Sequence, residues 1–121
     1  VLTILSYGNG LYLTLQAQKE IEKRIGNKIQ IIDLRWLSEI NEKKLLKTIG
    51  SCSKILIVDE CRKSGSYGEG IVADLHNVSK VSLKIKLHAA KNSFIPIGEG
   101  ATSTLPSKES IIEAAIELFN G

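Results

Sequence analysis

The sequence contains no methionine and few cysteines, prolines or aromatic residues. Of its 121 residues, two are Cys, two are Pro, and 5% are aromatic. Cys52 and Cys61 form no CxxC pair, and neither has a histidine at ligand spacing, which favours reduced thiols in a cytoplasmic protein over a structural metal. Because the chain starts at Val1 and has no Met, we expect residues 1–121 to be a single domain excised from a longer polypeptide.

Several other features are missing, and each absence excludes a class of function. No apolar run approaches the ~20 residues of a membrane span, so no membrane association is expected. The net charge of +3 comes from lysines scattered among acids, and with few aromatic side chains for stacking this argues against nucleic-acid binding. The sequence has neither GxGxxG nor GxSxG, so dinucleotide binding and hydrolase chemistry have no support. The remaining composition is that of an ordinary domain with one core.

Four apolar runs predict β-strands. Residues 2–5, 29–32 and 55–58 are unbroken and rich in apolar side chains, as in parallel strands that are covered on both faces. Residues 81–87 instead alternate apolar and polar side chains, which predicts a strand with one wet face nearer an edge of the sheet.

Four further segments have the spacing of amphipathic helices. The first ends near Gly26, the second is capped by Asn41, the third starts near Ser66, and the fourth is capped by Ser107. The expected apolar stripe of the first helix consists of Leu11, Leu15, Ile21 and Ile25. Strand and helix alternate four times, which predicts a three-layer α/β/α domain with a doubly wound, mainly parallel sheet of at least four strands. The irregular segment 89–106 is long enough to suggest packing on a neighbouring domain.

Charged residues follow the second strand immediately. Asp33 and Arg35 would pair with each other or with a neighbouring domain, and we interpret them as interface residues rather than substrate ligands. Trp36 would either cap the core or belong to a contact surface, and the sequence leaves both interpretations open.

A second group of candidates lies near the turn Tyr7-Gly8-Asn9-Gly10, which we interpret as a tight turn rather than an anion site. Glu60, Arg62, Ser66 and Tyr67 are predicted to face this turn across the switch point between the first and third strands. Such switch points are the usual place for a ligand or partner in open α/β sheets. No catalytic, cofactor-binding or metal-binding residue is predicted.

Four motifs carry a resemblance to a known family. In order, they are Thr3-Ile4-Leu5-Ser6-Tyr7-Gly8-Asn9, Ile32-Asp33-Leu34-Arg35, Val58-Asp59-Glu60 and Gly65-Ser66-Tyr67-Gly68. Together they resemble the C-terminal domain of the transketolase superfamily, and most closely the β-type region of the E1 component of 2-oxo acid dehydrogenase complexes. The sequence departs from the usual pattern at residues 38–41, where the turn proline is absent, and its Phe-Ile-Pro-Ile-Gly form is similar to E1 chains with fused α and β regions.

The resemblance implies a strand order of 2-1-3-4 and an additional antiparallel edge strand upstream of Val1. It also implies a full-length enzyme that uses thiamine diphosphate and Mg²⁺ to decarboxylate pyruvate or a branched-chain 2-oxo acid oxidatively and to pass the acyl group to a lipoyl arm. In that family, a Gly-Asp-Gly…Asn motif and an activating glutamate in other domains hold the cofactor. The 121-residue fragment is therefore expected to be inactive and to bind neither cofactor nor metal by itself.

The expected role of the chain is then assembly and docking. Its implied partners are other E1 domains or subunits, a second copy of the E1 chain in a homodimer, and the lipoyl acyltransferase E2. The candidate interface residues are Asp33, Arg35, Trp36, Glu60, Arg62 and Tyr67.

Two alternatives remain open. The chain could be a free-standing small-ligand or regulatory module that uses the cleft beside Tyr7. It could also be the C-terminal domain of a transketolase or a deoxyxylulose-phosphate synthase. Their phosphorylated substrates would call for a second basic group beside Arg35 at the strand ends, for which Arg62 and Lys63 are the only candidates.

Overall fold

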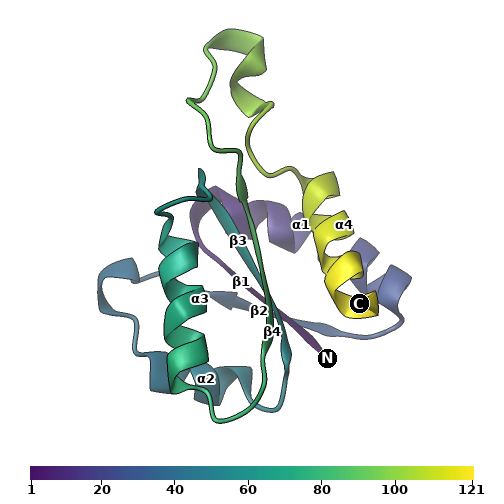
Figure 1. Ribbon diagram of the computed structural model, residues 1–121. Coiled ribbons are helices and arrows are strands. Elements are labelled where there is room, and N and C mark those ends of the chain that lie inside the picture. Colours follow the sequence, from purple (N-terminus) through teal and green to yellow (C-terminus); the bar gives the residue numbers. More distant parts are fainter.

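Strands and helices alternate along the whole chain (Figure 1). The computed structural model describes the backbone of residues 1–121 and the side chains of all of them except Ala101. The strands are β1 (Leu2–Ser6), β2 (Ile29–Asp33), β3 (Lys54–Arg62) and β4 (Lys84–Ala90). The helices are α1 (Gly8–Ile25), α2 (Glu42–Ile49), α3 (Tyr67–Val78) and α4 (Lys108–Asn120), with short 3-10 turns η1 (Leu37–Glu39) and η2 (Gly98–Thr102). None of the described helices is both long and apolar enough to cross a bilayer.

The four strands form one parallel sheet in the order β2-β1-β3-β4. The central strand β1 sets the register, since Leu5 is aligned with Ile32 of β2 on one side and with Ile57 of β3 on the other. Both the three-layer α/β/α fold and the strand order are thus confirmed. The chain crosses from one half of the sheet to the other between β2 and β3, so α1 and α3 lie on opposite faces.

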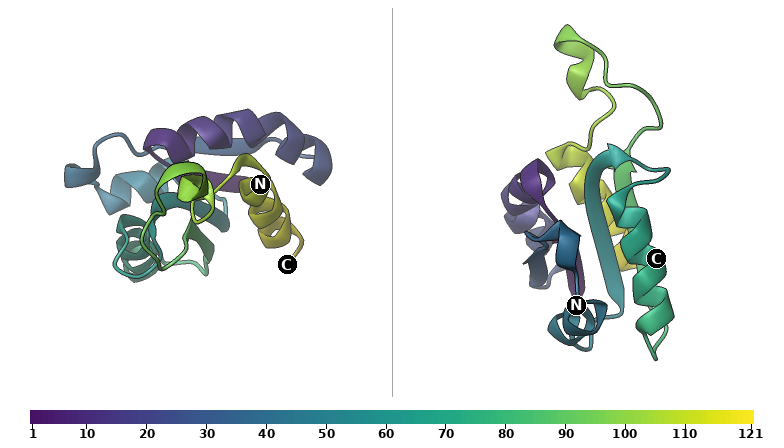
Figure 2. Two further views of the ribbon diagram at one scale, coloured as in Figure 1. Left: turned by 90° about the horizontal axis from the view of Figure 1, so that it is seen from above. Right: turned by 90° about the vertical axis from the view of Figure 1, so that its left-hand side faces the viewer.

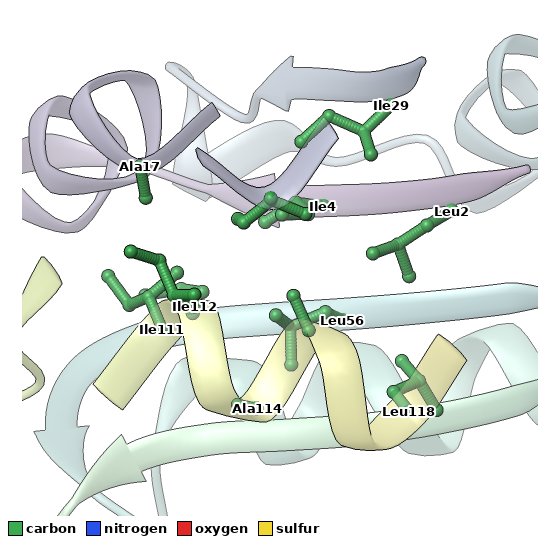
Figure 3. Close-up of a cluster of buried hydrophobic side chains, with 12 residues drawn as sticks. Leu2, Ile4, Ala17, Ile29, Leu56, Ile111, Ile112, Ala114 and Leu118 are labelled. Atoms are coloured by element: carbon green, nitrogen blue, oxygen red, sulfur yellow. The ribbon is translucent and has the colours of Figure 1, made fainter. Parts of the chain in front are cut away.

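Each face of the sheet has its own hydrophobic core. Helices α1 and α4 cover one face, where Ile4 and Leu56 of the sheet belong to one buried cluster with Ala17 of α1 and Ile111 and neighbouring residues of α4 (Figure 3). Helices α2 and α3 cover the other face; the buried side chains there include Leu5, Leu45, Ile55, Ile57, Ile71 and Leu75. Full burial of a Leu or Ile side chain contributes about 1.5–3 kcal/mol relative to exposure, so these two cores account for the stability of the domain.

The buried face of α1 differs from the predicted stripe. Ile21 is buried as expected, but Leu15 is 50% exposed, and small residues such as Gly10, Thr14 and Ala17 face the sheet instead. Small residues face the sheet because α1 packs closely on it: a Cβ atom on Gly10 would lie only 2.8 Å from the Ser6 Oγ. The prediction that Leu15 belongs to the apolar stripe is therefore wrong.

The fourth strand also begins later than predicted. It starts at Lys84, and Val81 lies before it in a loop with 69% of its surface exposed. The hydroxyl of Ser79 bonds to the backbone of Val81, donating to its carbonyl oxygen and accepting from its amide, which holds this segment in a turn. A local side-chain bond of this kind competes with strand pairing.

The predicted helix caps are present. The Asn41 side chain accepts a hydrogen bond from the Lys44 amide at 2.9 Å, and Ser66 accepts one from the Glu69 amide at 3.1 Å. Ser107 accepts a hydrogen bond from the Ser110 amide, which makes it the N-cap of α4. These contacts satisfy amide groups at the helix N-termini that have no partner within the helix.

Residues 91–106, here called the arm, connect β4 to α4. The arm projects past the carboxyl ends of the strands, away from both termini (Figures 1 and 2). The Lys91 amide donates to the Thr104 carbonyl at 2.9 Å and closes the base of the arm. Much of the long segment predicted to be irregular is thus a looped projection that contains η2.

Candidate interaction site at the carboxyl ends of the strands

The switch point between β1 and β3 is held together by Asp59. Its side chain is 1% exposed, and its Oδ1 atom accepts hydrogen bonds from the Tyr7 hydroxyl at 2.7 Å and the Cys61 amide at 2.8 Å. Its Oδ2 atom accepts a hydrogen bond from the Gly68 amide at 2.7 Å. A buried carboxylate is tolerated when it accepts several hydrogen bonds, so Asp59 joins the ends of β1 and β3 to the start of α3.

Tyr7 and Tyr67 form an aromatic pair above Asp59. Their ring centroids are 6.2 Å apart and the ring planes are inclined at 82°, an edge-to-face arrangement. Burial raises the pKa of Tyr7 well above its ordinary value, and its hydrogen bond to Asp59 adds to this effect. The Tyr7 hydroxyl therefore stays protonated and acts as a structural donor.

Tyr67 also forms one wall of a hollow between α3 and the segment that contains η1 and α2. Its hydroxyl donates to the Leu37 carbonyl and holds η1 against α3. The hollow, here called the α3 hollow, has a volume of about 460 Å³. Its lining includes apolar side chains such as Ile40 and Ile71 and two carboxylates, Glu42 and Asp74.

Asp33, Arg35 and Trp36 line a second hollow of about 440 Å³ beside β2, here called the β2 hollow. The Arg35 Nε atom lies 3.5 Å from Asp33 Oδ2, so the predicted pairing of these two residues is present in the structure. Trp36 is 74% exposed. The interpretation that Trp36 caps the core is therefore wrong, and its place on a contact surface stays a prediction.

Glu60 and Arg62 lie elsewhere on the same edge. They line a hollow of about 560 Å³ under the arm, together with Phe94 and Ile95, here called the arm hollow. The pairing of β3 with β4 is irregular between Asp59 and Arg62. Of the four residues predicted to face the turn after β1, Tyr67 packs on Tyr7 and Ser66 caps α3, whereas Glu60 and Arg62 line the arm hollow.

The sequence-based candidates are thus spread over three hollows along one edge, and some residues were missed. Asp59 belongs to the motif Val58-Asp59-Glu60, but the sequence alone predicts no role for it; the one local indication is that this acid directly follows an apolar run. Phe94 and Ile97 of the arm are 95% and 101% exposed. In the sequence, the only indication of these exposed side chains is the apolar run at residues 94–97, which lies in a segment with no helical or strand periodicity.

The described residues offer no cradle for a diphosphate and its metal. The Gly-acid-Gly sequence Gly98-Glu99-Gly100 begins η2 within the arm, with no strand leading into it. Sites that bind phosphates through a backbone turn need amides that converge at a helix start or nest. Among the residues that the structure describes, no three His, Cys, Asp or Glu side chains gather as a metal site.

A parallel sheet in the order 2-1-3-4, with helices on both faces and polar groups at the switch point, defines a doubly wound α/β domain. Residues 1–111 match the family model described as "Transketolase, C-terminal domain". The chain belongs to this family, as the resemblance predicted.

Comparison with known proteins agrees with this assignment. The chain is 28% identical over 116 residues to the pyruvate dehydrogenase E1 component subunit beta of Staphylococcus epidermidis, which covers 94% of the chain and 35% of the relative. It is 27% identical over 118 residues to the corresponding subunit of Staphylococcus aureus, which covers 96% of the chain and 36% of the relative. The chain therefore spans about a third of the length of these relatives.

A solved structure described as a split-gene transketolase, inactive beta4 tetramer, has the same fold. It superposes with a TM-score of 0.80 at 17% identity, over 98% of this chain and 38% of that one.

Proposed function

We propose that the chain is the C-terminal domain of a thiamine diphosphate-dependent 2-oxo acid dehydrogenase E1 component. In this proposal, residues 1–121 form a single domain of a longer E1 polypeptide, which assembles E1 domains and subunits and docks the lipoyl acyltransferase. The similarity to E1 beta subunits supports the parent enzyme class, since the two relatives above are pyruvate dehydrogenase subunits.

The observation that carries the assembly role is the apolar surface of the arm. Phe94, Ile95 and Ile97 are exposed there, and Trp36 is exposed separately beside β2. Large exposed apolar side chains that gather on one part of a surface mark interaction sites, and aromatic residues are enriched at the centres of interfaces. In the assembled enzyme these side chains would be buried against neighbouring domains.

The charged candidates complete this surface. Asp33 and Arg35 lie beside Trp36, and Glu60 and Arg62 lie beside Phe94 at the base of the arm. Charges around an apolar centre contribute more to orientation and partner choice than to affinity. We assign them to the rim of the contact surface, and we assign Tyr67 to its wall on the α3 side.

The chemistry of the enzyme belongs to its other domains in this proposal. Thiamine diphosphate and Mg²⁺, held there, would supply the decarboxylation and acyl-transfer chemistry. The present chain would supply no catalytic group, and its contribution to activity would come from keeping the E1 dimer assembled.

The experiment that tests this function compares the full-length polypeptide with residues 1–121 alone. Each is assayed for thiamine diphosphate-dependent decarboxylation of pyruvate and of branched-chain 2-oxo acids, with an artificial electron acceptor. We expect activity from the full-length protein and none from the domain. Turnover by the isolated domain, or a full-length protein that acts instead on phosphorylated ketoses, would contradict the proposal.

A further inference from the structure

The α3 hollow has an apolar floor and an open polar rim. Leu37 and Ile40 come from the η1 segment, and Ile71 comes from α3. Tyr67 closes one side through its bond to the Leu37 carbonyl. Gly70 leaves the α3 wall open, because a Cβ atom there would have no heavy atom within 4 Å.

The charge of this hollow is opposite to that of the molecule. The chain carries a net charge of +3, yet Glu42 and Asp74 are the ionisable carboxylates of the lining, and no Lys, Arg or His is among the described residues that line it. Burial raises the pKa of the Tyr67 hydroxyl, and the negative charges of Asp74 and Glu42 raise it further. The fields of both carboxylates therefore reach the wall of the hollow.

Neither carboxylate has a partner within the described part of the chain. The four salt bridges there involve other acids, and neither Glu42 nor Asp74 accepts a hydrogen bond. The Tyr67 hydroxyl cannot serve them, since it donates to Leu37. The hollow thus combines an apolar floor with two carboxylates that have no donor.

The α3 hollow adjoins the β2 hollow. Ile40 and Leu45 line both, and the exposed Trp36 lines the β2 hollow. An apolar floor beside two carboxylates suits the long aliphatic stem and the cationic head of a Lys or Arg side chain. Trp is also the residue type most often found to dominate binding energy at interfaces.

We propose that the α3 hollow binds a Lys or Arg side chain of a partner polypeptide, with a neighbouring apolar residue of that segment on its floor. The aliphatic stem of the basic residue lies along Ile40 and Ile71, and its cationic head lies between Glu42 and Asp74. This inference deepens the proposed docking function and rests on it, because it names the chemistry of the segment that docks.

The test uses the full-length polypeptide and a defined probe. The probe is a fluorescein-labelled peptide with a central Leu-Lys-Leu, and its matched control has Gln in place of Lys. Binding is followed by fluorescence anisotropy. We expect the Lys peptide to bind about tenfold more tightly than the Gln peptide, as for a hydrogen bond to a charged group.

Variants locate the binding to this hollow. Glu42→Gln combined with Asp74→Asn removes both charges, and Gly70→Trp fills the space; each is expected to weaken binding of the Lys peptide about tenfold. Glu20→Gln removes an exposed carboxylate on α1, outside the hollow, so this variant should bind the Lys peptide as the unmodified protein does. Urea unfolding of each variant confirms that it is folded.

Equal binding of the Lys and Gln peptides, or unchanged affinity in the double variant, would overturn the inference. So would failure of the Lys peptide to bind at millimolar concentration. The decarboxylation assay on the same preparation separates the two proposals. Normal decarboxylation without selective peptide binding contradicts the hollow alone, whereas absence of decarboxylation contradicts the proposed function.

Discussion

At the scale of single residues, Asp59 connects parts of the chain that are distant in sequence. One carboxylate oxygen accepts hydrogen bonds from the Tyr7 hydroxyl and the Cys61 amide, and the other accepts one from the Gly68 amide. Loss of a buried acceptor leaves its donors without partners, which costs more than the bonds themselves contribute. The geometry of the switch point therefore depends on this one side chain.

Replacing Asp59 with Ala is expected to destabilise the domain by about 3 kcal/mol, because the Tyr7 hydroxyl and two amides lose their acceptor. Tyr7→Phe removes a single donor and should cost about 1 kcal/mol. Urea denaturation of both variants and of the double variant measures the coupling. Additive losses in the double variant would show that Tyr7 and Asp59 do not interact in the folded protein.

His88 of β4 gives the domain a pH-dependent stability. Its Nε2 lies 2.8 Å from the Ser110 Oγ of α4. Burial lowers the pKa of this imidazole below its ordinary value of 6.5, and the nearby Lys86 charge lowers it further. The pKa of His88 is therefore lower in the folded protein than in the unfolded chain. As the pH falls through the pKa of the unfolded chain, the unfolded chain binds more protons than the folded protein does, and the free energy of unfolding decreases.

We therefore predict that unfolding free energy decreases between pH 7.5 and pH 5, and that His88→Gln makes this decrease smaller. The Gln side chain keeps a hydrogen-bonding group near Ser110 without a titrating charge. The pKa values of Glu22 and Glu117 are lowered below 4.5, so neither titrates in this window. Identical pH profiles for the two proteins would contradict the prediction.

The sequence predicts the local contacts of such residues better than the distant ones. The caps at Asn41 and Ser107 are predictable because each bonds within three residues of itself. The role of Asp59 is not, because its partner Tyr7 is 52 residues away in sequence. The hydrogen bonds of Asp59 depend on the strand order, which the residue itself does not encode.

At the scale of elements, small residues determine how closely the helices approach the sheet. Gly10 and Ala17 allow α1 to lie against β1 and β3, and Gly68 does the same for α3. The spacing of the large apolar residues predicts that Leu15 is buried. Because α1 packs closely on the sheet through its small residues, the Leu15 side chain points toward solvent instead. Hydrophobic spacing therefore predicts that a helix exists, but it does not always identify the buried face.

Two glycines of α3 provide a matched comparison. A Cβ atom on Gly68 would lie 2.6 Å from Leu87 Cδ1 and 3.1 Å from Asp59 Oδ2, so Gly68→Ala is expected to destabilise the domain by about 1–3 kcal/mol. Gly70→Ala meets nothing within 4 Å and should stabilise the helix by about 0.5–1 kcal/mol. Thermal unfolding of both variants checks the opposite signs; stabilisation by both would show that helix propensity alone decides.

At the scale of the whole molecule, the fold follows from the order of elements. Alternating strands and helices, together with short apolar strands, restrict the topology to a doubly wound sheet, and the resemblance supplies the strand order. The shape of the arm was not predictable in this way, because residues 91–106 have no periodicity and few internal contacts that would fix their path. Phe94 and Ile97 are exposed in this domain, and in the proposed assembly they would be covered by neighbouring domains.

The arm gives the most direct test of the assembly role. Phe94→Ser combined with Ile97→Ser removes apolar groups that make little contact within the domain, so its stability should change by less than about 0.5 kcal/mol. In the full-length polypeptide the same change should weaken assembly, because the buried centre of an interface carries most of its binding energy. Val81→Ser, which replaces an exposed apolar residue away from the arm, is the control.

The decisive measurement is sedimentation velocity of the full-length protein, carried out on the unmodified form, the arm variant and the Val81→Ser control at equal concentrations. The account predicts that the arm variant dissociates into smaller species and loses decarboxylase activity in parallel, while the control remains assembled. An arm variant with the same sedimentation coefficient and activity as the unmodified protein would contradict the assembly role of this domain.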